Sequence, residues 1–253
     1  MEISKNIEIA GTALWLKEHS AIIINDLHLG YEETLQRKGV LLPKFQLQEI
    51  FRQLEKILQK TQAKKVIING DLKHEFGKVL RQEWKDVLQF LDFLFQQEKE
   101  VIIIQGNHDP LLRFVSEKKG IQMVQKYAWG DTLIVHGDEI PKISAVDNEH
   151  PSAYKRIIIG HEHPAITLRE GSKREKYKCF LKGKWKGKEL KAKELIAVPS
   201  FNPLLEGTDV LKEKLLSPFL TDIKNFEVFV VGKEEGMYFG KVKELESKYS
   251  IGN

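Results

Sequence analysis

The sequence contains a single cysteine and no long apolar run. Because Cys179 has no partner among the 253 residues, an internal disulfide is excluded, and a reducing, cytoplasmic location is expected. No apolar stretch approaches the length that spans a bilayer, and the N-terminal MEISKNIEIAG lacks the apolar core of a signal peptide. These absences argue against a disulfide-stapled secreted scaffold and against a membrane protein, and we expect no membrane partner.

The rest of the composition is that of a globular protein. Hydrophobic residues make up 42% of the chain and charged residues 30%, which suffices for a core and a solvated surface. A chain of 253 residues is an ordinary length for one α/β domain. We therefore expect a single domain over residues 1–253, without internal repeats or disordered linkers.

Positive charge is concentrated in one segment. Residues 169–193, REGSKREKYKCFLKGKWKGKELKAK, carry a net charge of +8 in a chain whose total is +4, so the remainder is near −4. The pattern predicts a basic β-hairpin with KGKWKGK at its tip. The tip residues are Lys182, Lys184, Trp185 and Lys186. Two interpretations are open: a surface that follows a phosphate backbone while the indole stacks on a base, or a solvated edge strand.

Short apolar runs rich in isoleucine and valine recur along the chain, each closed by a polar cluster. They occupy residues 21–25, 65–69, 101–105, 132–136 and 156–160. Their length and composition predict strands that are buried on both faces. Helical patterns at 43–60 and 82–97 separate the first three runs, which predicts a parallel sheet. After about residue 120 few helices intervene, so mixed or antiparallel pairing is expected, and residues 226–242 predict a hairpin.

Each of these five predicted strands is followed by side chains that can bind a metal ion. In chain order the blocks are DLH (26–28), GDLKH (70–74), GNHD (106–109), HGD (136–138) and GHEHP (160–164). Sites in open α/β sheets form at the carboxyl ends of the strands, so we expect the blocks to meet. Carboxylate, imidazole and amide ligands without thiolate favour manganese, iron, zinc, cobalt or nickel. There are too many ligands for one ion, and two ions roughly 3.5–4 Å apart would use them.

The five blocks in this order resemble the signature of the calcineurin-like metallophosphoesterases, DxH…GD…GNHD…HGD…GHxHP. The resemblance covers about residues 20–205. More narrowly, DLHLGYE, GNHDP, GHEHPA, KCFLKG and PSFNPLLEG resemble the archaeal branch related to the nuclease subunit Mre11/SbcD. They are also similar to the phosphoesterases that bacteria encode beside DNA ligases. The resemblance implies a four-layer α/β fold, in which helices flank a sandwich of two mixed sheets and the metal site lies at the carboxyl ends of the strands.

Seven positions match the metal ligands of the family. The resemblance implies Asp26, His28 and His163 for one ion, Asn107, His136 and His161 for the other, and Asp71 as the bridge. It thereby implies two divalent transition-metal ions as cofactors, with manganese as the first choice and nickel, zinc, iron or cobalt as alternatives. An isolated Asp-x-His is more simply a turn or a helix cap, but the co-occurrence of all blocks favours the metal site.

Three further residues are implied near the reaction. His108 matches the catalytic histidine of the family, which protonates the leaving oxygen; the alternative is a partner that orients Asn107. His74 matches the second histidine of a GDxxH pattern and would contact substrate; the alternative is an exposed histidine at a helix start. Asp109 precedes Pro110, so we interpret it chiefly as a helix N-cap, which is compatible with orienting His108.

The implied function is hydrolysis of a phosphodiester bond by a metal-dependent phosphoesterase. The branch resemblance and the basic segment favour a nuclease that acts on DNA or RNA. One alternative is a phosphodiesterase of nucleotides or cyclic nucleotides. An alternative of another class is a non-catalytic metal-binding adaptor that works by protein contact, although the presence of His108 and of every expected ligand argues against it.

Overall fold

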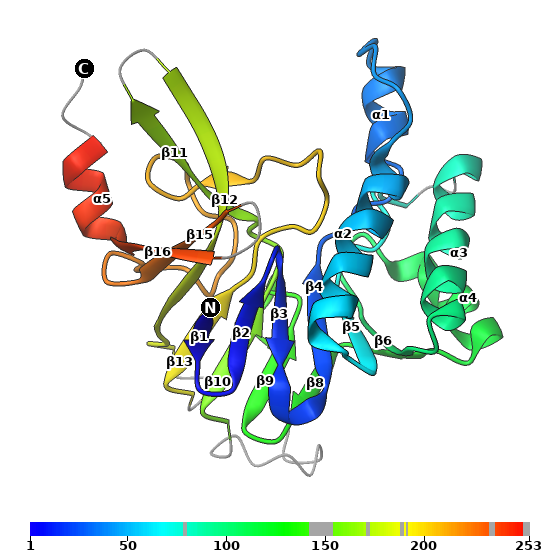
Figure 1. The fold of residues 1–253 in the computed structure, drawn as a ribbon, viewed down its shortest axis with the longest axis horizontal. Coiled ribbons are helices and arrows are strands. Elements are labelled where there is room, and N and C mark those ends of the chain that lie inside the picture. The colour runs from blue at the N-terminus through cyan, green and yellow to red at the C-terminus, as the bar shows by residue number, and fades with distance from the viewer. Residues whose placement is uncertain are drawn as a thin grey trace.

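Two β-sheets stacked face to face form the centre of the molecule in the computed structural model (Figure 1). The structure describes residues 1–77, 80–141, 154–170, 173–187, 190, 192–232 and 236–249. Helices cover the outer face of one sheet, and a helix with several loops covers the outer face of the other. The expected α/β sandwich of mixed sheets with flanking helices is thus confirmed. Among the described residues, no helix combines the length and apolar character that crossing a bilayer would require.

The first sheet has seven strands in the order β1-β2-β3-β4-β5-β6-β7. These are β1 (Glu2–Ser4), β2 (Ile7–Ala10), β3 (Ala13–Leu16), β4 (Ala21–Asn25), β5 (Lys65–Asn69), β6 (Glu100–Ile104) and β7 (Gln122–Val124). Pairing is antiparallel from β1 to β4 and parallel from β4 to β7. The helical segments of this half are η1 (Lys17–His19), α1 (Tyr31–Arg37), α2 (Gln46–Thr61), α3 (Arg81–Gln96), η2 (Pro110–Leu112) and α4 (Arg113–Lys119).

The second sheet has nine strands within the described residues. Its main path is β14-β11-β12-β13-β10-β9-β8, and β15 and β16 branch from β12. The strands are β8 (Lys126–Trp129), β9 (Thr132–Val135), β10 (Arg156–Ile159), β11 (Pro164–Glu170), β12 (Lys173–Lys184), β13 (Glu194–Ala197), β14 (Thr208–Asp209), β15 (Glu227–Val231) and β16 (Gly236–Lys241). Strand β10 pairs in parallel with both β9 and β13. The pairs β11–β12, β12–β15 and β15–β16 are antiparallel. Helix α5 (Val242–Tyr249) follows β16.

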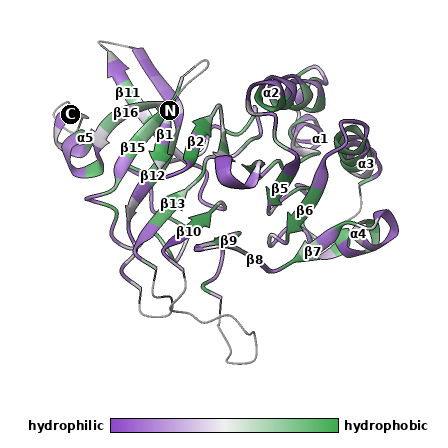
Figure 2. Cartoon of the chain, turned by 60° about the horizontal axis from the view of Figure 1, so that its bottom comes forward, coloured by the Kyte–Doolittle hydropathy of each residue, from purple (hydrophilic) through white to green (hydrophobic). Residues whose placement is uncertain are grey.

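The isoleucine-rich strands are buried on both faces, as their composition predicts. Because side chains alternate along a strand, Ile22 and Ile24 of β4 pack under the helices while Ile23 packs between the two sheets. The helix-side core includes Leu54 of α2 and Phe90 of α3. Figure 2 shows β5 and β6 largely in the hydrophobic colour, beside α2 and α3, in which hydrophobic and hydrophilic residues alternate. The parallel strands therefore reach the site from between two apolar layers.

The predicted position of the hairpin turn is wrong. Strands β11 and β12 pair from Ala165 with Lys178 to Glu170 with Lys173, so the chain reverses between residues 170 and 173. The segment KGKWKGK begins at the other end of β12, which goes on to pair with β13 and β15. Gly183 contributed to the prediction of a turn in this segment, but it lies inside the strand. The ring of Phe226 occupies the space that a side chain at Gly183 would need, so the glycine allows this ring to pack against β12. Residues 171–172, 188–189 and 191 of the predicted basic segment lie outside the described residues.

The predicted role of Trp185 in stacking on a base is also wrong. Its side chain is 6% exposed, its Nε1–H donates to the backbone oxygen of Leu190, and its ring packs on that of Phe219. An indole enclosed in this way offers no free face to a nucleobase. Of the neighbouring lysines, Lys186 pairs with Asp222 at 2.6 Å. Another, Lys182, lies 3.5 Å from a carboxylate oxygen of Glu227, so part of the charge counted in the sequence is neutralised locally.

Candidate metal centre

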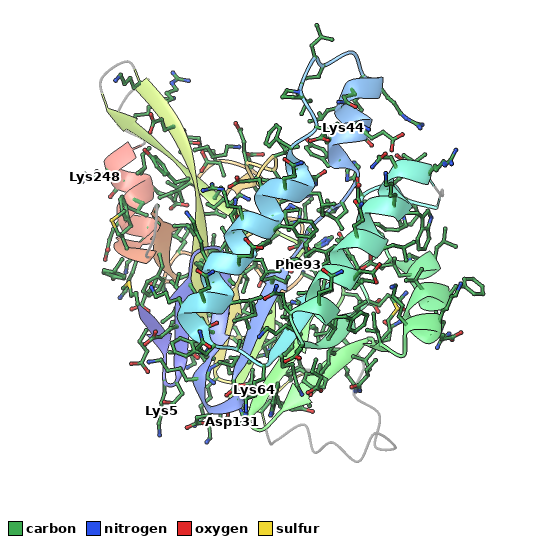
Figure 3. All side chains as sticks on the ribbon, turned by 45° about the vertical axis from the view of Figure 1, so that its right-hand side comes forward. Lys5, Lys44, Lys64, Phe93, Asp131 and Lys248 are labelled. Atoms are coloured by element: carbon green, nitrogen blue, oxygen red, sulfur yellow. The ribbon has the colours of Figure 1, made fainter. Side chains whose placement is uncertain are left out.

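Five loops converge at one end of the sandwich, where β4, β5 and β6 of the first sheet and β9 and β10 of the second sheet terminate. Figure 3 shows where the strands begin: Lys64 and Asp131, which precede β5 and β9, lie at the end of the molecule opposite Lys44 and α1. The carboxyl ends of these strands therefore point toward the side of Lys44 and α1. Backbone hydrogen bonds join the loops: His28 donates to Asp71 at 2.8 Å and Gly160 to His136 at 2.7 Å. The predicted blocks thus meet at the carboxyl ends of parallel strands, as expected.

The first group consists of Asp26, His28 and His163, whose ligand atoms lie within 4.8 Å of one another. Oδ2 of Asp26 is 3.5 Å from Nε2 of His163 and accepts a hydrogen bond from the backbone N–H of His161 at 3.1 Å. Asp26 and His28 are buried, and His163 is partly open to solvent. Burial and the neighbouring His163 hold the pKa of His28 well below its usual value, so its ring is neutral and able to bind a cation.

The second group consists of Asp71, His136 and His161. Nε2 of His136 lies 3.4 Å from Oδ2 of Asp71, 3.2 Å from Nδ1 of His161 and 3.1 Å from Oδ1 of Asn107. All four residues were expected as ligands or as the bridge of a metal pair. The ligand atoms of Asp71, His136 and His161 lie within 4.8 Å of one another, and Oδ1 of Asn107 lies beside them, so a small dication could bind in their midst.

Asp71 lies between the two groups. Its Oδ2 is 3.6 Å from Nε2 of His28 on one side and 3.4 Å from Nε2 of His136 on the other. Burial raises the pKa of Asp71, but the hydrogen bond and charge of His136 outweigh this effect and keep the carboxyl below its usual range. Burial likewise opposes the charged form of His136, yet the bond to Asp71 raises the pKa of this imidazole to about 9. A carboxylate shared by two imidazole groups in this way is placed to serve two ions.

The residues fit a pair of metal ions on two observations of this structure. Oδ1 of Asp26 and Nε2 of His28 are buried and, among the described residues, have no hydrogen-bond partner. A buried carboxylate oxygen without a hydrogen bond is costly, and Nδ1 of His136 lies 3.6 Å from Oδ1 of Asp26, beyond hydrogen-bond distance, so a cation at this point would supply the missing partner. The donor set also suits a transition metal, because it combines imidazole nitrogen and carboxylate oxygen, while the buried Cys179 lies in the second sheet and its thiol pKa is raised by burial.

The backbone at the candidate ligands is strained. Five of these residues adopt positive φ, a region that side chains other than glycine seldom occupy: Asp26 (52°), His28 (43°), Asp71 (45°), His161 (63°) and His163 (49°). Such conformations cost about 1–3 kcal/mol each and persist where the surroundings enforce them, typically at functional sites. The left-handed residues turn their side chains inward from the strand ends, so all five point to the same centre.

Two glycines leave room for this crowding. A Cβ atom at Gly70 would lie 2.0 Å from Nδ1 of His136, and Gly70 itself has φ of +78°. At Gly106 a Cβ atom would lie 2.2 Å from Oδ1 of Asp71. Each distance is far inside a van der Waals contact, so a larger residue would displace a candidate ligand.

His108 stands beside the two groups with its ring partly exposed. Its backbone N–H donates to Oδ1 of Asp71 at 3.0 Å, and its Nε2 lies 3.9 Å from Oδ2 of the same carboxylate. His74 was expected near substrate, and its Nδ1 is 3.4 Å from Nδ1 of His28. Burial and the neighbouring His108 lower the pKa of His74 to about 4, so this ring is neutral at pH 7. The ring of His74 therefore both faces the site and can fix the tautomer of His28.

The expected capping bond of Asp109 is wrong. Asp109 does occupy the N-cap position before η2, with Pro110 next, but its side chain makes no capping bond. The fully buried carboxylate accepts the backbone N–H groups of Leu72 and Lys73 at 3.3 Å and of Gly106 at 3.1 Å. These donors belong to the GDLKH and GNHD loops, so Asp109 fastens together the two loops that carry Asp71 and His108.

A layer of residues under the first group has no assigned role in the sequence-based interpretation. Ser200 donates its hydroxyl to the backbone oxygen of Asp26 at 2.7 Å, and Nδ2 of Asn202 lies 3.4 Å from the backbone oxygen of His28. Nζ of Lys178 in turn donates to the backbone oxygens of Ser200 and Asn202. Burial lowers the pKa of Lys178 to about 7, against the opposing charge of Asp26. These residues belong to the KCFLKG and PSFNPLLEG blocks, to which the sequence assigned no role. In the structure the two blocks support the loop that carries Asp26 and His28.

A second support lies beneath His74. Lys73 and Glu83 are buried, with Nζ 3.6 Å from Oε2, and Oε1 of Glu83 accepts the backbone N–H groups of His74 at 2.9 Å and Glu75 at 2.6 Å. No sequence signal marks Glu83, because an acidic residue in the first turn of a helix is ordinary. The GDLKH loop is therefore held from below by an ion pair that only the fold reveals.

Comparisons with known proteins extend over most of the chain. The family model described as calcineurin-like phosphoesterase matches residues 19–232. The crystal structure of the Pseudomonas putida nuclease MPE has a TM-score of 0.59 at 17% identity, over 89% of this chain and 92% of that chain. The phosphoesterase Yfce from E. coli has a TM-score of 0.39 at 12% identity, over 87% of this chain and 98% of that chain. No curated protein matches the sequence. At such identities the likeness to the nuclease concerns the fold alone.

Proposed function

The chain belongs to the calcineurin-like phosphoesterase family and is a metal-dependent phosphoesterase; from this premise we propose that it is a nuclease that hydrolyses phosphodiester bonds of DNA or RNA with two metal ions. The observation that carries the proposal is the position of Asp71 between two groups of imidazole and carboxylate ligands. The fold shared with a Pseudomonas putida nuclease supports the choice of substrate. So does the resemblance of the motif blocks to the branch related to Mre11/SbcD.

We assign the ligands as the two groups divide them. Asp26, His28 and His163 would hold one ion, Asn107, His136 and His161 would hold the other, and Asp71, which lies between the groups, would serve both. When bound, two such ions offset charge on the phosphoryl oxygens and lower the pKa of a water molecule. Manganese suits this set of oxygen and nitrogen ligands, and nickel, zinc, iron and cobalt are the alternatives.

His108 is the proton donor in this proposal. Its Nδ1 faces the backbone oxygen of His74 at 2.5 Å, so Nε2 is the nitrogen left to face the substrate. As an acid the ring carries hydrogen on both nitrogens, and the proton on Nε2 passes to the oxygen that departs from phosphorus, which leaves the neutral ring with its hydrogen on Nδ1. Asp109 acts indirectly, as a positioning residue, since it holds the loops that carry Asp71 and His108. His74, neutral by its low pKa, offers a hydrogen bond to the phosphate rather than a proton.

One panel of substrates tests the proposal. The purified protein is loaded with Mn²⁺, its metal content is measured, and it is assayed with bis-p-nitrophenyl phosphate, cyclic nucleotides, linear and circular DNA, and RNA. We expect about two ions per chain, hydrolysis of the small diester and of a nucleic acid, and loss of both activities with EDTA. The variant Asp71→Asn should lose metal together with activity, because the carboxylate contacts both groups.

Separate outcomes would contradict separate parts of the proposal. A single ion per loaded chain would exclude the two-metal assignment. Turnover of cyclic nucleotides or small diesters without cleavage of any nucleic acid would leave a phosphodiesterase and exclude the nuclease. Cleavage of linear DNA but not of circular DNA would identify an enzyme that acts from ends.

A further inference from the structure

An exposed phenylalanine stands against the histidine that we assign as proton donor. The side chain of Phe76 is 61% exposed, yet its ring centroid lies 5.6 Å from that of His108 with the planes at 89°. Isolated exposed apolar residues are common on protein surfaces, so exposure alone says little. What distinguishes Phe76 is its place: the exposed ring lies beside His108, the group that meets the leaving oxygen.

The backbone that carries Phe76 is anchored. Glu83 accepts the N–H groups of His74 and Glu75, the two residues before it, at 2.9 and 2.6 Å. Glu83 is itself buried against Lys73. The loop is therefore held in place as far as Glu75, the residue before Phe76. Little conformational entropy is then lost when a ligand orders the ring of Phe76.

The ring continues a row of aromatic groups along one side of the site. Ring centroids are 4.9 Å apart between Tyr31 and His74, 6.0 Å between His74 and His108, and 5.6 Å between His108 and Phe76. The two histidines lie within the row and contact the ligand groups, and Tyr31 ends it on the other side against His74. Phe76 is the exposed end of the row, since Tyr31 at the other end is only partly open to solvent.

We propose that Phe76 is a stacking platform for the nucleobase on the leaving-group side of the scissile phosphate. The inference rests on the proposed nuclease function and names its substrate class: single-stranded or frayed nucleic acid, in which a base face is free. The side follows from His108, since the nucleoside that takes its proton lies next to it and so next to Phe76. Stacking on an aromatic side chain tolerates any base, so the platform selects for an unpaired base rather than for a sequence.

The test uses single-stranded oligonucleotides with one cleavable phosphodiester, all other linkages being methylphosphonates. One oligonucleotide has bases on both sides of the cleavable bond, a second has an abasic residue on the 3′ side, and a third has one on the 5′ side. For the protein as it exists, we expect kcat/KM to fall roughly 5- to 150-fold for the abasic residue on one side only, the range typical of one stacked base. That side identifies the leaving group.

Variants of Phe76 separate stacking from support of His108. In Phe76→Ala the ratio of base to abasic kcat/KM should fall to near one, and in Phe76→Trp it should be kept or increased. The matched control is Phe95→Ala, an exposed phenylalanine near the far end of α3, which should leave the ratio as in the parent protein. If Phe76→Ala slows all three oligonucleotides equally and leaves the ratio unchanged, the ring only supports His108 and the platform is excluded.

The small diester keeps this test distinct from that of the nuclease proposal. Cleavage of all three oligonucleotides at equal rates by the parent protein would overturn the platform while leaving the nuclease intact. Hydrolysis of bis-p-nitrophenyl phosphate without cleavage of any oligonucleotide would overturn both. A platform of this kind further requires that a duplex with a paired base at the same position be cleaved more slowly than the single strand; equal rates would contradict it.

Discussion

Nδ1 of His108 lies 2.5 Å from the backbone carbonyl oxygen of His74. A carbonyl oxygen only accepts, so Nδ1 carries the hydrogen of this bond, and the tautomer of the neutral ring follows from it. Nε2 is thereby directed toward the ligand groups, 3.9 Å from Oδ2 of Asp71. The GDLKH loop thus sets the chemistry of the GNHD loop: the backbone of one decides which nitrogen of the other meets substrate.

Replacing this histidine should separate catalysis from metal binding. In His108→Ala we expect kcat for a phosphodiester to fall about 10²- to 10⁴-fold, the usual contribution of a positioned acid, with the metal content unchanged. Metal analysis and steady-state kinetics on the same preparation measure both quantities. The control is His19→Ala, which removes a histidine that packs on Trp129 instead of facing the site. Unchanged kcat, or loss of metal from His108→Ala, would contradict the assigned role.

Metal binding should stabilise the fold. The two groups bring buried carboxylates together with atoms that lack a partner, so ions that bind only the folded chain add free energy of unfolding. At an ion concentration 100 times Kd the gain is about 2.7 kcal/mol, which for a chain of this size corresponds to roughly 5–10 °C in Tm. Calorimetry with Mn²⁺ and then with EDTA measures the shift. An equal shift in Asp71→Asn would mean that the ions bind elsewhere.

The ligand positions could be anticipated from the sequence because each follows a recognisable strand. The runs at 21–25 and 65–69 coincide with β4 and β5, and the other three are displaced by at most one residue. Parallel strands bring their ends together, so blocks separated by more than a hundred residues had to meet. The seven side chains implied as ligands do lie together, and their roles as ligands stay a prediction that metal analysis tests.

The supporting residues could not be anticipated, because their partners are distant in sequence and their residue types are ordinary. Glu83 follows the helical pattern and reveals nothing of the N–H groups it accepts. The tip of the basic hairpin was misplaced for a similar reason: Gly183 was interpreted as a turn residue, whereas Phe226 of a later loop requires the glycine inside β12. Local composition predicts turns and strands, but not which distant side chain fills a space.

The space at Gly70 gives a prediction with an internal control. Gly70→Ala places a Cβ atom 2.0 Å from Nδ1 of His136, and the residue has φ of +78°, so both collision and backbone strain result. Gly120→Ala has a similar φ of +65°, but nothing lies within 4 Å of the added atom. We expect Gly70→Ala to lose metal and activity, while Gly120→Ala keeps both and loses only about 1 kcal/mol of stability. Equal effects on metal content would show that strain, not the crowded ligand, is responsible.

Asp109 should matter to stability as well as to turnover. Asp109→Ala removes the acceptor of three backbone N–H groups in the interior, and each unsatisfied donor costs about 1–3 kcal/mol. We expect the free energy of unfolding, from denaturant titration, to fall by at least about 3 kcal/mol. Asp222→Ala, which changes an exposed carboxylate, should be close to the parent protein. If Asp109→Ala were as stable as the parent, the three hydrogen bonds of Asp109 would not contribute to stability. A change in kcat would then need another cause.

The projecting hairpin leads to a prediction about nucleic-acid binding that also tests the expectation placed on Lys182, Lys184 and Lys186. Figure 1 shows the β11–β12 hairpin and α1 projecting from the molecule on the same side. The exposed cations near the turn are Lys173 and Arg174, whereas Lys184 lies at the opposite end of β12. From Lys173 to Lys184 the strand rises by eleven residue steps, so its two ends are about 35 Å apart.

A pair of double variants distinguishes the two ends. Each phosphate contact with a single strand contributes about −0.7 to the slope of log K against log salt concentration. We expect the double variant Lys173→Ser with Arg174→Ser to bind single-stranded DNA more weakly across all sequences and to flatten that slope by up to about 1.4. The matched double variant Lys184→Ser with Lys186→Ser should bind as the parent protein does. Hydrolysis of a small diester should persist in both, because the metal groups lie on other loops. If instead the second variant loses binding and the first does not, nucleic acid lies along the far end of β12. In that case the lysines singled out in the sequence are the contacts, and the projecting turn is a solvated edge.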